Sequence, residues 1–304
     1  MRIGIMLGAT PDPEASLEKF IATARDVERR GFASLWLAQI RGHDAVMAMA
    51  LAARETERIE VGTAVTPIQP RHPTALAQQA LTAAAQARGR FTLGIGLSHK
   101  VVIEGALGLS YAQPAKTMRE YLDILCPMLA GEPAKAKGEL YRSVWSADVS
   151  DAAKPVPLLL AALGPQMLQL AGSRSDGTIL WMTGARTIAE HVRPTIDRAA
   201  TAAGRPASRV IAGFPVVLTD DEAGGREAVG KQLAVYGQLP SYRAMLDREG
   251  VAGPAELALV GNEARLDAAL SAIADAGADD LIAVLVETDE GARARTLDFL
   301  QSRL

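Results

Sequence analysis

Cysteine and histidine, which often act as metal ligands, nucleophiles and bases, are sparse in this sequence. It contains a single cysteine, Cys126, and four histidines, which are His43, His72, His99 and His191. No two histidines have the HExxH spacing of a zinc site, and the sequence has no second cysteine to complete one. Cys126 lies in an apolar helical pattern, which favours core packing over a nucleophilic role. The sequence therefore predicts neither a metal site nor an intrachain disulfide.

Two glycine-containing turns are candidates for holding a ligand. Gly94 and Gly96 end an apolar stretch, but a dinucleotide-binding fingerprint requires a small residue where His99 stands. These glycines could contact a ligand or only allow a strand to end tightly. In the turn from Leu163 to Met167, glycine and proline precede a helical pattern, which would leave free backbone N–H groups. Such groups suit a phosphate, although an ordinary helix start is an equal alternative.

The elements that must position these turns form a repeating pattern of strand and helix. The expected strands are Arg2–Leu7, Ser34–Ala38, Ile59–Val65, Phe91–Ile95, Val156–Leu163, Thr178–Met182, Arg209–Leu218 and Asp280–Val286. A helical pattern follows each strand, as parallel strands require because no tight turn can join them. These repeats predict an α/β fold, a single (β/α)8 TIM barrel with insertions. No linker divides residues 1–304, so we expect one domain.

Two irregular segments interrupt the alternation of expected strands and helices. Those helices are Glu14–Arg30, His43–Glu55, Pro73–Gln86, Pro114–Leu129, Gln166–Ala171, Ile188–Ala203, Glu222–Tyr236, Ser241–Glu249, Glu263–Ala276 and Gly291–Leu304. A loop, Leu97–Ala112, follows the fourth strand, and a polar insertion, Glu132–Pro155, follows the fourth helix. Long ordered loops at strand ends are usually functional. We expect both segments at the barrel mouth, the insertion as a solvated hairpin or as a lid over the site.

The active site of such a barrel lies at the carboxyl ends of its strands. The residues expected there are Gly8, Ala9, Gln39, Ile40, Ala64–Thr66, Gly96–His99, Leu163–Met167, Thr183, Gly184 and Glu287. They include one histidine and one carboxylate, which is poor equipment for acid–base, nucleophilic or metal chemistry. A site made mostly of backbone, small side chains and amides suits a cofactor that carries the chemistry itself.

The overall charge limits the partners. The formal net charge is −3, so no basic field favours nucleic acid or an anionic membrane. The N-terminal run MRIGIMLG reads as a strand and lacks the features of a signal peptide, and no apolar run approaches the length of about 20 residues that spans a bilayer. We expect a soluble, cytoplasmic protein that acts on a small molecule.

Several stretches together resemble the bacterial luciferase-like superfamily of flavin- and deazaflavin-dependent oxidoreductases. They are MRIGIMLG, GFASLWLAQ, GTAVTPIQPRHPTALAQQALT, GRFTLGIGLSH, LLLAALGPQMLQLAG and DGTILWMTG. The motifs GHDAV and LSHK resemble most the branch that uses coenzyme F420, a 5-deazaflavin. The resemblance implies a barrel, usually homodimeric, that transfers hydride between the deazaflavin ring and an organic substrate.

The resemblance also assigns residues around the ring. The family's non-prolyl cis peptide bond falls at Ala64–Val65, beside Thr66 and against one face of the ring. Gly96, Ser98 and His99 fall near the ring edge, and His99 is the candidate for polarising a carbonyl or moving a proton, with a structural histidine as the alternative. Gln39 stands near the substrate in place of the acidic or other polar residue of many relatives, which puts a carboxylate proton donor in doubt.

Further positions are implied for the phosphate and the substrate. Leu163, Gly164 and Met167, together with Thr183 and Gly184, are expected to hold the ribityl phosphate. Tyr242 and Arg243 are candidates for the substrate pocket or the cofactor tail, with a solvated helix face as the alternative.

Three functions are compatible with these residues. The first is a coenzyme F420-dependent oxidoreductase, and the second is an FMN-dependent luciferase-like monooxygenase that uses the same pocket. The third is a non-catalytic protein that binds a deazaflavin or flavin. A barrel lyase or isomerase is disfavoured, because the strand ends supply no lysine–carboxylate pair to run one.

Overall fold

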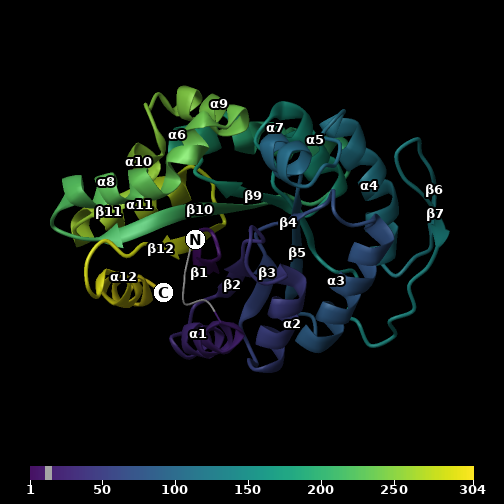
Figure 1. Cartoon of the computed structure of the whole chain (residues 1–304), viewed down its shortest axis with the longest axis horizontal. Helices are drawn as coiled ribbons and strands as arrows, with labels where there is room; N and C mark the ends of the chain where they lie inside the picture. The colour runs from purple at the N-terminus through teal and green to yellow at the C-terminus, as the bar shows by residue number, and fades with distance from the viewer. Residues whose placement is uncertain (11–15) are drawn as a thin grey trace.

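The computed structural model describes residues 1–10 and 16–304, and strands and helices alternate along this part of the chain (Figure 1). Parallel strands close into a barrel in the order β1, β2, β3, β5, β8, β9, β10 and β12, and β12 pairs back to β1. Their bounds are β1 Arg2–Leu7, β2 Ser34–Leu37, β3 Glu60–Thr63, β5 Phe91–Gly96, β8 Leu158–Leu160, β9 Gly177–Trp181, β10 Arg209–Leu218 and β12 Asp280–Leu285. The predicted (β/α)8 barrel is confirmed, and each expected strand has a counterpart.

The helices surround this barrel (Figure 1). They are α1 Leu17–Arg29, α2 Ala45–Arg54, α3 Pro73–Ala87, α4 Pro114–Leu129, α5 Pro165–Arg174, α6 Ala185–Thr187, α7 Arg193–Ala202, α8 Glu222–Leu233, α9 Pro240–Glu249, α10 Pro254–Leu257, α11 Glu263–Asp275 and α12 Ala292–Gln301. Three further helical segments are η1 Val101–Ala106, η2 Ile188–Val192 and η3 Ala234–Gln238. The expected start of the first helix, at Glu14, lies outside the described residues.

Two short strands depart from the expected pattern. The strand expected from Ile59 to Val65 ends earlier, since β3 stops at Thr63, and a turn separates it from the additional short strand β4, Thr66–Pro67. The unexpected β11, Leu259–Gly261, pairs with the end of β10. Its three residues are too few to show a strand period in the sequence.

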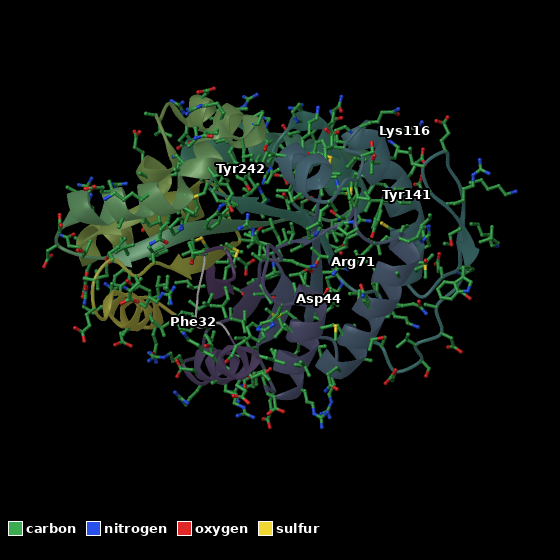
Figure 2. The ribbon with its side chains drawn as sticks, viewed as in Figure 1. Phe32, Asp44, Arg71, Lys116, Tyr141 and Tyr242 are labelled. Carbon is green, nitrogen blue, oxygen red and sulfur yellow. The ribbon has the colours of Figure 1, made fainter. Side chains whose placement is uncertain are left out.

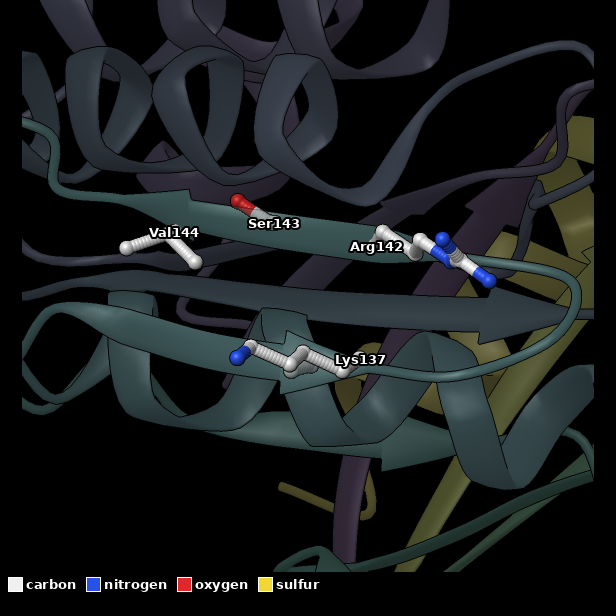
Figure 3. Close-up of a pocket in the computed structure, with 5 residues that line it drawn as sticks. Lys137, Arg142, Ser143 and Val144 are labelled. Carbon is white, nitrogen blue, oxygen red and sulfur yellow. The ribbon is translucent and has the colours of Figure 1, made fainter.

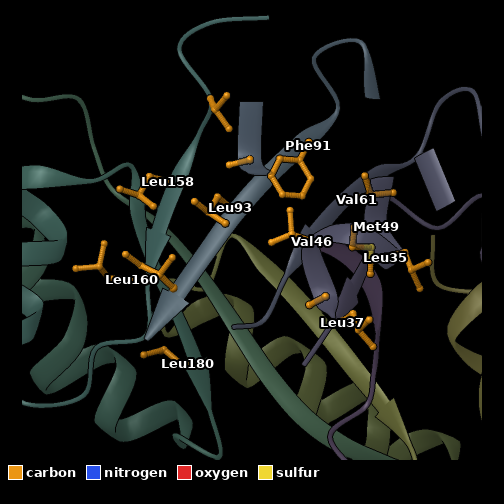
Figure 4. Packing of buried hydrophobic residues seen from close by; sticks show 14 of the residues in the cluster. Leu35, Leu37, Val46, Met49, Val61, Phe91, Leu93, Leu158, Leu160 and Leu180 are labelled. Carbon is orange, nitrogen blue, oxygen red and sulfur yellow. The ribbon is translucent and has the colours of Figure 1, made fainter. Parts of the chain in front are cut away.

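The core follows from the two-residue period of the strands. In β2, Leu35 and Leu37 belong to the cluster that packs under the helices, whereas Trp36 belongs to a second cluster inside the barrel. In β8, Leu158 and Leu160 likewise face outward, where Figure 4 shows them beside β5. Strands that are apolar on both faces are typical of parallel sheets covered by helices. The apolar runs in the sequence therefore predict the barrel well.

A charged cluster occupies the amino-terminal end of the barrel. Arg209 donates to both carboxylate oxygens of Glu60, at 2.7 and 3.0 Å, and to both of Asp280, at 2.8 and 3.1 Å. Arg2 adds an ion pair to Asp280, at 2.8 Å. Each of these four residues is the first of its strand, and the Arg209 guanidinium lies 5.8 Å from the ring centroid of Trp36. This ion cluster therefore fills the barrel at the end opposite its mouth.

The polar insertion forms an antiparallel hairpin of β6, Ala134–Lys137, and β7, Arg142–Trp145. Its Tyr141 ring lies 5.3 Å from that of Tyr121 on α4 and 5.9 Å from that of His72 at the start of α3. The hairpin stands outside α4 at the right edge of Figure 1, and a hollow of about 600 Å³ lies along its strands (Figure 3). These contacts favour the solvated hairpin over the lid.

The loop Leu97–Ala112 contains a turn of π-helix, η1, which the sequence pattern does not predict. The backbone carbonyl of His99 starts this turn by accepting from the N–H groups of Val102 and Ile103, each at 2.9 Å. Among the described residues, no helix combines the length and apolar character needed to cross a membrane.

Candidate active site

The turn between β3 and β4 brings Ala64 and Val65 to the inner cluster at the barrel mouth. The peptide bond between them is cis, at the position that the family resemblance implies. Both side chains pack against buried residues of that cluster, which also contacts Tyr242. Thr66, expected to contact the cofactor, is fully buried, and its hydroxyl has no hydrogen-bond partner among the described residues. Ala64 and Val65 are therefore partly exposed at the mouth, whereas the Thr66 hydroxyl is inaccessible.

The two glycines of β5 accommodate the side chain of Val65. A Cβ on Gly96 would lie 2.7 Å from Val65 Cγ2, closer than real Cβ contacts come. A Cβ on Gly94 would overlap the carbonyl oxygen of Thr63 and lie 3.1 Å from Val65 Cγ1. Of the two alternatives, the tight strand end accounts for both glycines, because close packing there leaves no room for a side chain. A contact of Gly96 with a ligand stays a prediction.

We expect Gly96→Ala to destabilise the protein by about 1 to 3 kcal/mol, the usual cost of overpacking. Urea unfolding measures this free energy. Adding Val65→Ala should recover part of the loss, because it removes the Cγ2 atom that the new methyl group meets. Gly105→Ala is a matched control, since a Cβ there meets no atom within 4 Å. Equal destabilisation of the single and double variants would show that Val65 is not the obstacle.

His99 lies beside Tyr242, which α9 brings across the barrel mouth. Their ring centroids are 5.6 Å apart, at an interplanar angle of 52°. Burial lowers the pKa of His99, so its imidazole is neutral at pH 7. A neutral imidazole has one N–H donor and one acceptor nitrogen. His99 can therefore donate a hydrogen bond to a substrate or take up a proton from it.

The lowered pKa of His99 also makes a pH-dependent contribution to stability. In the unfolded chain histidine protonates near pH 6.5, whereas the folded protein disfavours that charge. We therefore expect this contribution to be constant above about pH 6.5 and to become destabilising as the pH falls below it. An NMR titration should place the midpoint of the His99 ring below about 6.5, with the signal assigned by its loss in His99→Gln. A midpoint at or above that value would contradict burial of the ring.

Ser98 supports the loop that carries His99. Its backbone has a φ of 56°, in the left-handed region, and its carbonyl oxygen accepts from the Tyr111 hydroxyl at 3.3 Å. The structure thus shows Ser98 as a residue that turns the chain after β5.

Gln39 lies at the end of β2, where its side chain is tied to α2. Its Oε1 atom accepts from the backbone N–H of Ala45 at 3.2 Å. Asp44 caps the same helix by accepting from Met47 N at 3.0 Å, and it pairs with Arg71. Figure 2 labels Asp44 and Arg71 on the α2 and α3 side of the molecule, away from Tyr242. The Gln39 amide can therefore donate a hydrogen bond, but it cannot act as a proton donor in the way a carboxylic acid does.

The first of the two expected phosphate turns is open. Gly164 caps α5 without a side-chain hydrogen bond, and a Cβ on it would meet no atom within 4 Å. Pro165 is the first helical residue, so the free N–H groups begin at Gln166 and Met167. The carbonyl oxygen of Leu163 is not available there, because it accepts from Nε2 of His191 at 2.9 Å. The N-terminus of α5 therefore has both the space and the donors for an anion.

The second expected phosphate turn is already filled. Thr183 is fully buried, and its hydroxyl donates to the carbonyl oxygen of Trp181 at 3.4 Å. Beyond Gly184, the carboxylate of Glu249 accepts from the backbone N–H groups of Arg186 and Thr187. The N–H groups that follow Thr183 and Gly184, where a phosphate is expected, are thus already bound to a carboxylate of the protein itself. No local pattern around Glu249 in the sequence signals this long-range contact.

An aromatic row extends from His99 along one side of the mouth. The Tyr242 and Tyr236 rings are 5.0 Å apart, and those of Tyr236 and Trp181 are 6.1 Å apart. Burial, followed by the proximity of Tyr236, raises the pKa of Tyr242. The structure therefore places Tyr242, expected in the substrate pocket, at the mouth.

The side chain of Arg243 is hydrogen-bonded within its own segment of the chain. Its guanidinium donates to the carbonyl oxygens of Val251 and Ala252, at 2.8 and 2.7 Å, and to Asp247. These bonds tie the Arg243 side chain to the residues that follow α9. They give Arg243 a structural role, and its expected role in the substrate pocket or the cofactor tail stays a prediction.

The chain is similar to known proteins over its whole length. The family model described as luciferase-like monooxygenase matches residues 1–303. A protein of Mycobacterium tuberculosis, named as a proposed coenzyme F420-dependent oxidoreductase, is 31% identical over 254 residues, which are 78% of this chain and 72% of that protein.

Solved structures share the fold at lower sequence identity. The coenzyme F420-dependent tetrahydromethanopterin reductase from Methanopyrus kandleri superposes with a TM-score of 0.82 at 20% identity, covering 100% of this chain and 98% of that one. The oxygenating constituent of 3,6-diketocamphane monooxygenase from Pseudomonas putida, in complex with FMN, gives 0.78 at 17% identity, covering 99% and 96%. Structures of both cofactor classes thus share this barrel.

Proposed function

Because the chain belongs to the luciferase-like monooxygenase family, we propose that it is a coenzyme F420-dependent oxidoreductase acting on a small organic substrate. The similarity to a relative named for coenzyme F420 supports this cofactor. The observation that carries the proposal is the composition of the barrel mouth, where a neutral imidazole and a phenol stand beside an apolar platform and an open helix N-terminus.

The residues present fit such a cofactor. Ala64 and Val65 supply an apolar surface for a planar ring, and the N–H groups at the start of α5, next to Gly164, are free for a phosphate. When bound, the deazaflavin supplies the hydride chemistry, so the protein has to provide binding, orientation and proton transfer.

In this proposal, His99 donates or accepts the proton that accompanies hydride transfer. Reduction of a carbonyl or imine places negative charge on oxygen or nitrogen, and oxidation of an alcohol releases a proton. A neutral imidazole near this position can donate a hydrogen bond in the first direction and accept the proton in the second. The half-buried ring of Tyr242 limits the access of water to His99. The Gln39 amide, held at the start of α2, is the expected hydrogen-bond partner on the substrate side of the ring.

Titration of the purified protein with oxidised coenzyme F420 and with FMN tests the cofactor assignment. Binding can be followed by quenching of tryptophan fluorescence, to which Trp181 in the aromatic row contributes. We expect tighter binding of coenzyme F420. Tighter binding of FMN would contradict the proposal and favour the FMN-dependent monooxygenase.

Turnover separates the enzyme from a protein that only binds the cofactor. Reduced coenzyme F420 can be offered with a panel of enones, imines and ketones, and the oxidised form with alcohols. We expect a change in deazaflavin absorbance with at least one class. Tight binding without turnover on the whole panel would favour the non-catalytic alternative.

A further inference from the structure

Glu249, the last residue of α9, places its carboxylate at the start of α6. One oxygen accepts from the backbone N–H of Arg186 at 3.2 Å. The other accepts from the backbone N–H of Thr187 at 2.8 Å and from its hydroxyl at 2.6 Å. These donors are the free N–H groups of a helix N-terminus, which attract negative charge.

Two further contacts show that this arrangement is built into the fold. A Cβ on Gly184 would overlap the Glu249 carboxylate, so glycine at this position leaves the room that the carboxylate fills. In return, the Arg186 guanidinium donates to the backbone carbonyl of Arg248, at the end of α9. A side chain of α9 therefore binds free N–H groups at the start of α6, and a side chain of α6 binds a backbone carbonyl at the end of α9.

The filled turn adjoins the open one. β8 and β9 are neighbouring parallel strands, so the turns after them, which begin α5 and α6, lie at the same edge of the barrel. His191 of η2 bonds the Leu163 carbonyl at 2.9 Å and ties the two turns together. One phosphate could therefore be offered two sets of N–H donors, and only the set at α5 is free.

We propose that Glu249 determines where the cofactor phosphate binds and how strongly the site prefers a phosphate. The carboxylate keeps phosphate off the N–H groups of Arg186 and Thr187 and confines it to the start of α5. The Glu249 carboxylate and a phosphate at the neighbouring turn carry like charges, and their repulsion lowers the affinity for a phosphate-bearing ligand by roughly fivefold or more. This inference rests on the proposed function, because it assumes a cofactor with a phosphate on its side chain.

The test compares the affinity for coenzyme F420 with that for its riboside precursor, which has the same deazaflavin ring without the phosphate. Fluorescence titration gives both dissociation constants for the wild-type protein and for Glu249→Gln. Glutamine has nearly the same size and removes only the charge. We expect the preference for coenzyme F420 over the riboside to rise by roughly fivefold or more, with the affinity for the riboside almost unchanged.

Matched variants separate charge from packing. Glu249→Ala should raise the same preference, and inorganic phosphate should raise its melting temperature more than that of the wild type. Asp247→Asn removes one charge from the exposed side of the same helix and should leave the preference at the wild-type value. A preference unchanged in both Glu249 variants, or equal weakening of the two ligands, would overturn the inference and leave Glu249 a structural residue. Failure of the wild type to bind either ligand would instead reject the proposed function.

Discussion

Replacing His99 with alanine is expected to lower turnover by about two to four orders of magnitude, the range for loss of a general acid or base. The affinity for the cofactor should change by no more than about threefold, because Ala64, Val65 and the start of α5 remain in place. Steady-state turnover and fluorescence titration on the same preparation measure the two quantities.

Two comparisons decide whether His99 acts chemically or only fills space beside Tyr242. Added imidazole should restore part of the turnover of His99→Ala if a proton carrier is what the variant lacks. Tyr242→Phe keeps the ring that packs on His99 and removes only the hydroxyl, so it should retain far more turnover than His99→Ala. A parallel loss of turnover and cofactor affinity in His99→Ala, without rescue by imidazole, would mean a structural histidine.

The second large effect concerns stability. Arg209→Met should destabilise the protein by about 3 to 5 kcal/mol, because it leaves the carboxylates of Glu60 and Asp280 without their main partner inside the barrel. Asp280 is 1% exposed. Although burial alone lowers the pKa of Arg209, its hydrogen bonds to the two carboxylates outweigh that effect and raise the pKa. Urea unfolding at neutral pH measures the change.

Controls for Arg209 come from the surface and from its own cluster. Arg303 also pairs with two carboxylates, Glu263 and Asp267, but at the protein surface, so Arg303→Met should cost much less. Adding Glu60→Gln to Arg209→Met should recover part of the stability by removing one of the unpaired charges. A stability of Arg209→Met close to that of the wild type would show that the ion cluster is dispensable.

The barrel could be predicted from the sequence because its signal is local. Runs such as Leu158–Leu160 are apolar on both faces, and Gly, Pro and capping residues mark the helix ends between them. The turn at Ala64–Val65 and the position of His99 follow from the same local stretches, once the family resemblance is added.

The contacts that complete the site were out of reach of local patterns. Glu249 meets Arg186 across 63 positions of the chain, and neither residue lies in a recognisable motif. Tyr242 lies beside His99, whereas its neighbour Arg243 bonds to residues that follow α9. This difference depends on how α9 is oriented. The burial of the Thr66 hydroxyl likewise depends on packing around β4, which the strand pattern does not describe.

The ion cluster at the amino-terminal end of the barrel has a kinetic consequence. Arg209, Glu60 and Asp280 close this end of the barrel beneath the buried ring of Trp36, so we expect ligands to enter from the mouth. Cofactor and substrate then enter through the same opening at the barrel mouth. The ligand that binds deeper therefore has to bind first and dissociate last. For a barrel that is closed at its amino-terminal end, we therefore expect a compulsory order of binding, which product-inhibition patterns would reveal.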